Sequence, residues 1–193
     1  YRSLEGTNVP RDFVEMPSQI MENWFVEPDM LALFAKHYKT GKVIPQELVD
    51  KIQKSSKYGQ GFGTVEYLAA SYLDMDYHIL TQPLTENPMK FEDQKMKELG
   101  LIPEIISRYR STYYNHIFTT GYDAGYYSYI WAEVLDKDAF EKFKEDGIFN
   151  RATAIGFRHI LERGNSEDPM KMYIEFRGKE PSITPLLKGR GLM

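Results

Sequence analysis

Apolar residues recur every three or four positions along most of this chain, which is the period of an amphipathic α-helix. The alternation of apolar and polar residues that marks a β-strand is nearly absent. The pattern predicts two long helices, over about residues 64–80 and 123–144, with shorter helices before, between and after them. We therefore expect an all-α fold.

Three segments interrupt the helical pattern. A helix predicted from Pro10 to about Phe25 contains Pro17, which has no backbone N–H, so we expect a kink or a break there. Residues 59–63 form a glycine-rich stretch that we interpret as a linker, and it lacks the Lys-Ser/Thr of a phosphate-binding P-loop. Residues 108–121 fit either a broken helix or a short extended piece.

Composition limits the classes of protein that this chain can belong to. It has 193 residues, of which 42% are hydrophobic and 27% charged, as in soluble globular proteins. The net charge of −4 disfavours nucleic acid and anionic membrane surfaces as partners. The absence of cysteine excludes disulfides and thiolate metal sites and is compatible with a reducing cytoplasm, although a periplasmic location stays open. No apolar run reaches the roughly 20 residues of a membrane helix, and no signal-peptide pattern opens the chain.

A carboxylate near the start of the chain has an unusual setting. Glu15 lies two residues before the interior Pro17, at the head of an amphipathic run. A glutamate in the first turns of a helix ordinarily serves solubility or the helix dipole, and that is the alternative for Glu15. Glu22 follows seven residues later, two helical turns along the same face, and a surface carboxylate is its alternative.

Tyrosines gather past the middle of the chain. The chain has 14 tyrosines, and six of them lie between residues 113 and 129. Tyr122, Tyr126 and Tyr129 have the spacing i, i+4 and i+7, which places them on one stripe along a helix. An aromatic core stripe is one interpretation of this spacing. Buried phenol hydroxyls need hydrogen-bond partners, however, and a polar cleft supplies them more readily than a dry core.

Two strings resemble a known family of enzymes. The string from Gly6 to Gln19, Gly-Thr-Asn-Val-Pro-Arg-Asp-Phe-Val-Glu-Met-Pro-Ser-Gln, resembles the segment that supplies the glutamate zinc ligand in the thimet-oligopeptidase family of metallopeptidases. The string 116–129 resembles the substrate loop of that family, in which a histidine, a glycine-rich turn and a series of tyrosines face the zinc. The turn here reads Thr119-Thr120-Gly121, with less glycine than relatives often carry. The resemblance covers almost the whole chain.

The resemblance implies zinc-dependent hydrolysis of peptide bonds in short peptides, with Glu15 as a zinc ligand and Glu22 orienting a ligand histidine. The family's other two ligands and its general base belong to an HExxH helix, and no HExxH occurs in these 193 residues. No pair among the four histidines has the i, i+4 spacing of a helical zinc pair: His37, His78, His116 and His159.

We therefore expect residues 1–193 to be the C-terminal portion of a multi-helical, zincin-type catalytic domain with one irregular Gly/Tyr loop. The missing partner would be the amino-terminal part of the same polypeptide. We also expect the chain by itself to hold no stoichiometric zinc and to have no peptidase activity.

The resemblance assigns roles to the second string as well. His116 and Tyr122 would hydrogen-bond the peptide substrate, and Tyr126 would line the same face. Tyr129 would donate to the oxyanion that forms as water attacks the scissile carbonyl, a role that typically contributes on the order of 10²–10³ in rate.

Three further strings look like the bacterial peptidyl-dipeptidase branch of the family: residues 108–113, 163–168 and 190–193. Enzymes of that branch remove dipeptides from the free carboxyl end of peptides. Arg108 and Arg110 would then bind the substrate carboxylate, because the arginine fork is bidentate; a structural salt bridge is the alternative for both.

Two other functions remain open. An oligopeptidase of the same family would cut internally in short peptides. A non-catalytic helical module would bind extended peptides in an aromatic groove. Single-stranded nucleic acid could also stack on tyrosines, but the acidic balance of the chain disfavours this.

Overall fold

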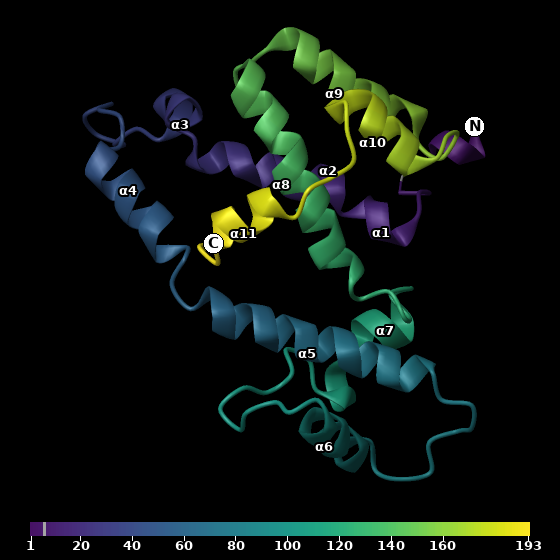
Figure 1. Cartoon of the computed structure of the whole chain (residues 1–193). Helices are drawn as coiled ribbons and strands as arrows, with labels where there is room; N and C mark the ends of the chain where they lie inside the picture. Colours follow the sequence, from purple (N-terminus) through teal and green to yellow (C-terminus); the bar gives the residue numbers. More distant parts are fainter. Residues whose placement is uncertain (6) are drawn as a thin grey trace. The chain divides into compact units, whose positions relative to one another are not determined.

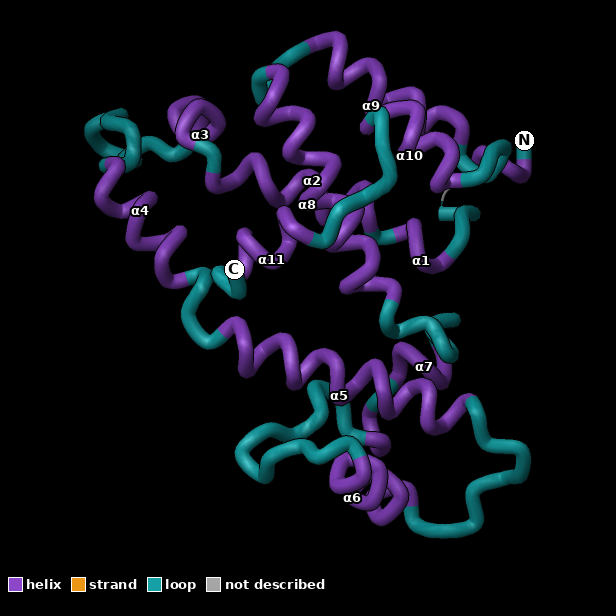
Figure 2. Tube along the Cα trace, in the orientation of Figure 1, coloured by secondary structure: helices purple, strands orange, loops and turns teal. Residues whose placement is uncertain are grey.

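The computed structural model describes residues 1–5 and 7–193, so Gly6, the first residue of the opening string, lies outside the described residues. Throughout the described part, every regular element is a helix (Figures 1 and 2). The nearest approach to a sheet there is an isolated antiparallel bridge between Lys36 and Val43. The predicted all-α fold is confirmed. None of the described helices is long and apolar enough to cross a membrane.

The chain divides into two compact units. One consists of residues 1–58 and 130–193, and the other of residues 59–129. The first unit contains the following elements: η1 (Arg2–Leu4), α1 (Arg11–Val14), α2 (Met16–Glu22), η2 (Asn23–Val26), α3 (Pro28–Phe34), α4 (Gln46–Ser55), most of α8 (Ser128–Asp146), α9 (Arg151–Arg163), α10 (Pro169–Arg177) and α11 (Thr184–Arg190).

The core of the first unit forms around α8, against which α1, α2, α9 and α10 contribute apolar side chains. Phe140 and Phe143 of α8 both meet the ring of Trp24 edge-on, at centroid distances of 4.6 and 4.8 Å. The Trp24 indole N–H donates to the carbonyl of Ile148 at 2.9 Å, so its polar atom is satisfied at the edge of this core. Helices α9 and α10 pack directly on each other (Figure 1).

The helix predicted to start at Pro10 is broken at Glu15, two residues before Pro17. Helix α1 ends at Val14, Glu15 adopts a turn, and α2 starts at Met16. The ring of Pro17 clashes with the carbonyl four residues earlier and offers no N–H to it, so the first helix cannot continue. The expected break is confirmed, and it leaves Glu15 at the junction of two short helices.

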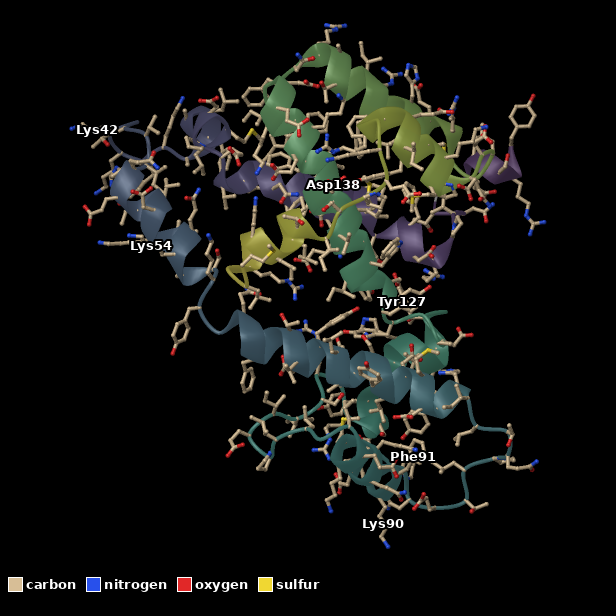
Figure 3. The ribbon with its side chains drawn as sticks, viewed as in Figure 1. Lys42, Lys54, Lys90, Phe91, Tyr127 and Asp138 are labelled. Carbon is tan, nitrogen blue, oxygen red and sulfur yellow. The ribbon has the colours of Figure 1, made fainter. Side chains whose placement is uncertain are left out.

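Buried acidic groups of α8 bind side chains of α10 and of η2. Asp138, near the middle of α8 (Figure 3), accepts a hydrogen bond from the Tyr173 hydroxyl at 2.7 Å. Arg177 pairs with Asp138 and, through both terminal nitrogens, with Glu145. Asp136 accepts from the Asn23 amide at 2.9 Å and is 1% exposed.

Asp136 predicts a pH-dependent stability of the first unit. Burial raises the pKa of Asp136 from 3.8 to about 6, even though Lys137 and Asn23 favour the ionised form. The contribution of protonated Asp136 to the free energy of unfolding is therefore complete below about pH 4 and is lost as the pH rises through about 6. The loss amounts to about 3 kcal/mol, because the pKa is raised by roughly 2 units. Asp136→Asn is neutral at every pH and should lack this part of the pH dependence.

The measurement uses the two tryptophans of the chain, Trp24 and Trp131, which both lie in the first unit. Urea unfolding followed by their fluorescence, across this pH range, should give converging stabilities for wild type and variant at low pH and diverging ones at high pH. The exposed Asp29→Asn serves as the control. Parallel curves for Asp136→Asn and wild type would show the prediction to be wrong.

The second unit is built on one long helix, α5 (Gln60–His78), against which α6 (Pro88–Glu98) packs. The segment between α6 and α8 contains η3 (Ser111–Tyr113) and α7 (Asn115–Thr119), so the broken-helix interpretation of residues 108–121 is confirmed. The core lies between these elements and consists of Ala69, Ala70, Leu73, Phe91, Met96, Tyr114, Ile117 and Tyr126.

The linker predicted over residues 59–63 is wrong, because α5 already begins at Gln60. Only Gly59 keeps a special role, since it precedes the helix with φ +70°, a conformation that favours glycine. Gly61 and Gly63 lie inside the helix. Each glycine costs about 1 kcal/mol relative to alanine, and a 19-residue helix with a packed face tolerates that cost.

Candidate active site

The tyrosine-rich segment of the second unit is a turn that leads into a helix. Helix α8 begins at Ser128, and residues 122–127, here called the tyrosine turn, precede it. The expected helical stripe of Tyr122, Tyr126 and Tyr129 is therefore wrong, because only Tyr129 lies in the helix. Within the turn, the N–H of Gly125 donates to the carbonyl of Tyr122 at 2.8 Å.

The three tyrosines nevertheless meet, because the turn folds them around His116 of α7. The His116 ring lies 6.0, 5.5 and 6.2 Å from the rings of Tyr122, Tyr126 and Tyr129. Tyr122 and Tyr129 are stacked at 5.1 Å with an angle of 13°. Tyr109, which the sequence did not single out, lies 4.8 Å from His116. We call this set, together with Tyr114, the ring cluster.

The members of the ring cluster differ in exposure, and this separates their chemistry. Tyr126 is 3% exposed, whereas Tyr129 is partly buried and Tyr122 lies between them. Burial raises the pKa of Tyr126 far above its ordinary value, although Arg108 partly offsets this, so its hydroxyl stays protonated. Tyr126 thus has the surroundings of a core residue, and Tyr129 has the most accessible ring of the three.

The two arginines expected to bind a substrate carboxylate lie in different surroundings. Arg110 forms an ion pair with the buried Glu92, which also accepts from the N–H and the hydroxyl of Ser111, each at 2.7 Å. Arg108 is an exposed residue; its guanidinium donates to the Tyr126 hydroxyl and lies 6.0 Å from the centre of the Tyr109 ring. Arg110 therefore has the structural partner that its alternative required, and Arg108 borders the ring cluster.

Helix α5 holds the tyrosine turn from one face. The Tyr67 hydroxyl donates to the carbonyl of Tyr126 at 2.5 Å. Seven residues later, Asp74 accepts from the backbone N–H groups of Ala124 and Tyr126, at 2.9 and 2.8 Å. Positions seven apart lie on the same face of a helix, so Tyr67 and Asp74 contact the turn together.

Sequence reasoning missed Tyr67, Tyr109 and Asp74. The one available signal was the carboxylate of Asp74 next to the apolar face that contains Ala70 and Leu73, because an acidic residue there must be paired if it is buried. Nothing in the spacing of the residues indicates what its partners are, since they lie 50 and 52 positions further along the chain.

The proposed metal-binding carboxylate lies in the first unit. Glu15 is half-buried at the junction of α1 and α2, and its backbone carbonyl accepts from the Ser18 hydroxyl at 2.9 Å. Glu22 is exposed at the end of α2. Among the described residues, no group of three or more His, Cys, Asp or Glu side chains is placed to hold a metal ion. A metal site that included Glu15 would therefore need further ligands from outside the described residues.

The chain is similar to several known peptidases. Dipeptidyl carboxypeptidase of Escherichia coli strain K12 is 43% identical over 197 residues, which cover 100% of this chain and 29% of that protein. Oligopeptidase A of the same organism is 40% identical over 188 residues, or 96% of this chain and 28% of that protein. Saccharolysin of Saccharomyces cerevisiae is 34% identical over 190 residues, or 96% and 26%. The chain thus spans less than a third of the length of these relatives.

A family model described as peptidase family M3 matches residues 1–192, which is almost the whole chain. The resemblance of the opening string and of the tyrosine-rich segment to a peptidase family is confirmed by this match. On these grounds the chain belongs to peptidase family M3.

Proposed function

We propose that the chain is the C-terminal part of the catalytic domain of a zinc peptidase that acts on short peptides. The longer polypeptide that would include these 193 residues is called the parent protein below. Membership of peptidase family M3 supports the activity, and the greater length of the relatives supports a larger parent. In this proposal the present chain contributes side chains to a site that the rest of the parent completes.

Glu15 would provide one ligand of the metal, and Glu22 would orient a histidine ligand from the rest of the parent. The proposal needs the other ligands from outside this chain, since the described residues hold no complete donor set. A glutamate carboxylate is one of the side chains that bind catalytic zinc, and Glu15 lies half-buried at the turn between two short helices. When bound, zinc supplies a Lewis acid that polarises the substrate carbonyl and lowers the pKa of a water molecule.

Tyr129 would donate its hydroxyl proton in a hydrogen bond to the oxyanion that develops on the scissile carbonyl. The observation that carries this proposal is the stack of Tyr129 on Tyr122 beside His116, with Tyr129 partly exposed. The stack fixes the ring, so the hydroxyl needs no reorganisation as the negative charge develops. His116 and Tyr122 would hydrogen-bond the peptide backbone, and Tyr126 would support them from the core.

Release of C-terminal dipeptides is the proposed specificity, with Arg108 as the group that binds the free carboxylate of the substrate. Arg108 is an exposed residue next to the ring cluster, whereas Arg110 is already paired with Glu92. The identity with dipeptidyl carboxypeptidase supports this specificity. Internal cleavage is the second candidate, since oligopeptidase A is almost as similar to this chain.

A pair of matched peptides tests the specificity in the parent protein. One peptide has a free C-terminal carboxylate and the other a C-terminal amide. Loss of a hydrogen-bonded charge pair should lower kcat/KM for the amide by about 10- to 100-fold. Arg108→Gln should lower kcat/KM for the free acid by a similar factor and leave the amide unchanged, so that the two peptides become equivalent.

Lys97→Gln is the control, since Lys97 is an exposed cation on α6 of the same unit. It should preserve the discrimination between the two peptides. Equal cleavage of acid and amide by the unmodified parent would exclude dipeptide release and favour internal cleavage. Hydrolysis of neither peptide would contradict the peptidase proposal itself.

A further inference from the structure

Asp74 of α5 accepts hydrogen bonds from the backbone of the tyrosine turn through both of its carboxylate oxygens. One carboxylate oxygen accepts from the N–H of Ala124 at 2.9 Å, and the other accepts from the N–H of Tyr126 at 2.8 Å. The first oxygen also contacts Nδ1 of His78 at 2.9 Å, one turn further along α5. Asp74 itself is 0% exposed. This buried carboxylate of the second unit thus binds the turn through both oxygens and His78 through one of them.

The turn needs an external support of this kind. Ala124 has φ +52°, a conformation that non-glycine residues rarely adopt. Such a conformation persists only where the surroundings hold it. Asp74 binds the N–H of Ala124 itself and that of Tyr126, two residues later. The Tyr67 hydroxyl adds a third bond from the same face of α5.

An ionised carboxylate suits this position better than any other side chain of its size. It accepts at both oxygens and donates at neither, so it can satisfy two converging N–H groups. An asparagine in its place has one acceptor oxygen, and its NH₂ group would face the second N–H. The chemistry of the site therefore distinguishes Asp74→Asn from wild type even though the two side chains have nearly the same shape.

We propose that Asp74 is a positioning residue that holds the tyrosine turn in the conformation in which Tyr122 and Tyr129 stack beside His116. The inference rests on the proposed function for its consequence in catalysis, since Tyr129 is the oxyanion donor there. The structural part stands without that function. Asp74 does not touch the substrate; it acts through the backbone of the turn.

Hydrogen–deuterium exchange of the 193-residue chain tests the structural part. In Asp74→Asn, the amide of Ala124 or that of Tyr126 should exchange faster by about 10-fold or more, as expected for one lost bond to a charged acceptor. The amide of Met96 in α6 should stay protected, which shows that the unit remains folded. Asp76→Asn, two residues further along α5, is the control and should leave both turn amides unchanged.

Unchanged exchange of both turn amides in Asp74→Asn would overturn the inference. If Asp74→Asn unfolds the unit and exposes Met96 as well, Asp74→Glu decides, because it restores two acceptor oxygens. Protection of both turn amides in Asp74→Glu supports the inference, and loss of protection at either overturns it.

A double-mutant cycle in the parent protein tests the catalytic consequence. Asp74→Asn should lower kcat by about 10-fold or more with little change in KM, because it displaces a transition-state donor. In a Tyr129→Phe background the same substitution should cost less than about threefold, since the hydroxyl that it positions is gone. Equal losses in both backgrounds would overturn the inference. If Tyr129→Phe alone leaves kcat unchanged, the proposed function fails, and the exchange result is unaffected.

Discussion

Glu15→Gln in the parent protein should remove both bound zinc and peptide hydrolysis. A catalytic zinc site has three protein ligands, and a neutral amide is a poor replacement for an anionic carboxylate. The metal contributes several kcal/mol of transition-state stabilisation, so kcat/KM should fall by at least about 10³-fold. Metal content per protein after dialysis, measured by atomic emission, and hydrolysis of a short peptide are the two readouts.

Two variants and one truncated form complete this experiment. Glu5→Gln changes an exposed carboxylate of the same segment and should retain metal and activity. Glu22→Gln should lower zinc affinity by about 10- to 100-fold, the usual cost of losing a group that orients a ligand. The 193-residue chain alone should retain no stoichiometric zinc. A Glu15→Gln protein with one zinc per chain would refute the ligand proposal.

Tyr129→Phe in the parent protein should lower kcat by about 10²- to 10³-fold and leave KM nearly unchanged. The substitution removes the hydroxyl alone and keeps the ring that stacks on Tyr122 at 5.1 Å. Loss of a donor that acts only in the transition state lowers kcat and kcat/KM equally. Steady-state kinetics with a single short peptide measure both parameters.

Tyr127→Phe is the matched control for this prediction. Tyr127 immediately precedes α8 (Figure 3) and is 45% exposed, and it has no ring contact with His116 among the described contacts. Its loss should change kcat by less than about threefold, as for most surface substitutions. A Tyr129→Phe protein as active as Tyr127→Phe would remove Tyr129 from the mechanism and leave the oxyanion without a donor in this chain.

The break at Glu15 shows what local chemistry makes predictable. Pro17 excludes a continuous helix whatever surrounds it, because the missing N–H and the ring clash depend on neighbouring residues alone. The structure accordingly ends α1 at Val14 and starts α2 at Met16. The helical period along α5 and α8 is local in the same sense, apart from the exact residue at which each helix begins.

The conformation of the tyrosine turn could not be predicted from neighbouring residues. The spacing of Tyr122, Tyr126 and Tyr129 is compatible with a helix, and nothing near them in sequence forbids one. Helix α8 starts only at Ser128, because Tyr67 and Asp74 of α5 (Gln60–His78) bind the backbone of the turn before it. A carboxylate that accepts two N–H groups offers the backbone an alternative to the helical ladder, and it does so only in the folded unit.

The roles of the two arginines also depend on contacts that the sequence does not reveal. Arg108 and Arg110 are equivalent candidates in sequence, two residues apart and beside the same tyrosines. Burial of Glu92 in the second unit selects Arg110 as its partner, because an unpaired buried carboxylate is costly. Arg108 stays exposed beside the ring cluster, where its side chain donates to the Tyr126 hydroxyl.

The sequence by itself determined the all-helical class, the break before Pro17, the peptidase family and the set of candidate site residues. Helical period, proline chemistry and motif composition are properties of neighbouring residues, so they can be recognised without the fold. The tertiary structure alone decided that His116, Tyr122 and Tyr129 meet through a turn, that Tyr126 is buried, and that Arg110 is paired. These outcomes depend on Asp74, Tyr67 and Glu92, which act across tens of residues. Buried polar groups must find partners wherever the fold brings them, and sequence spacing carries no record of that choice.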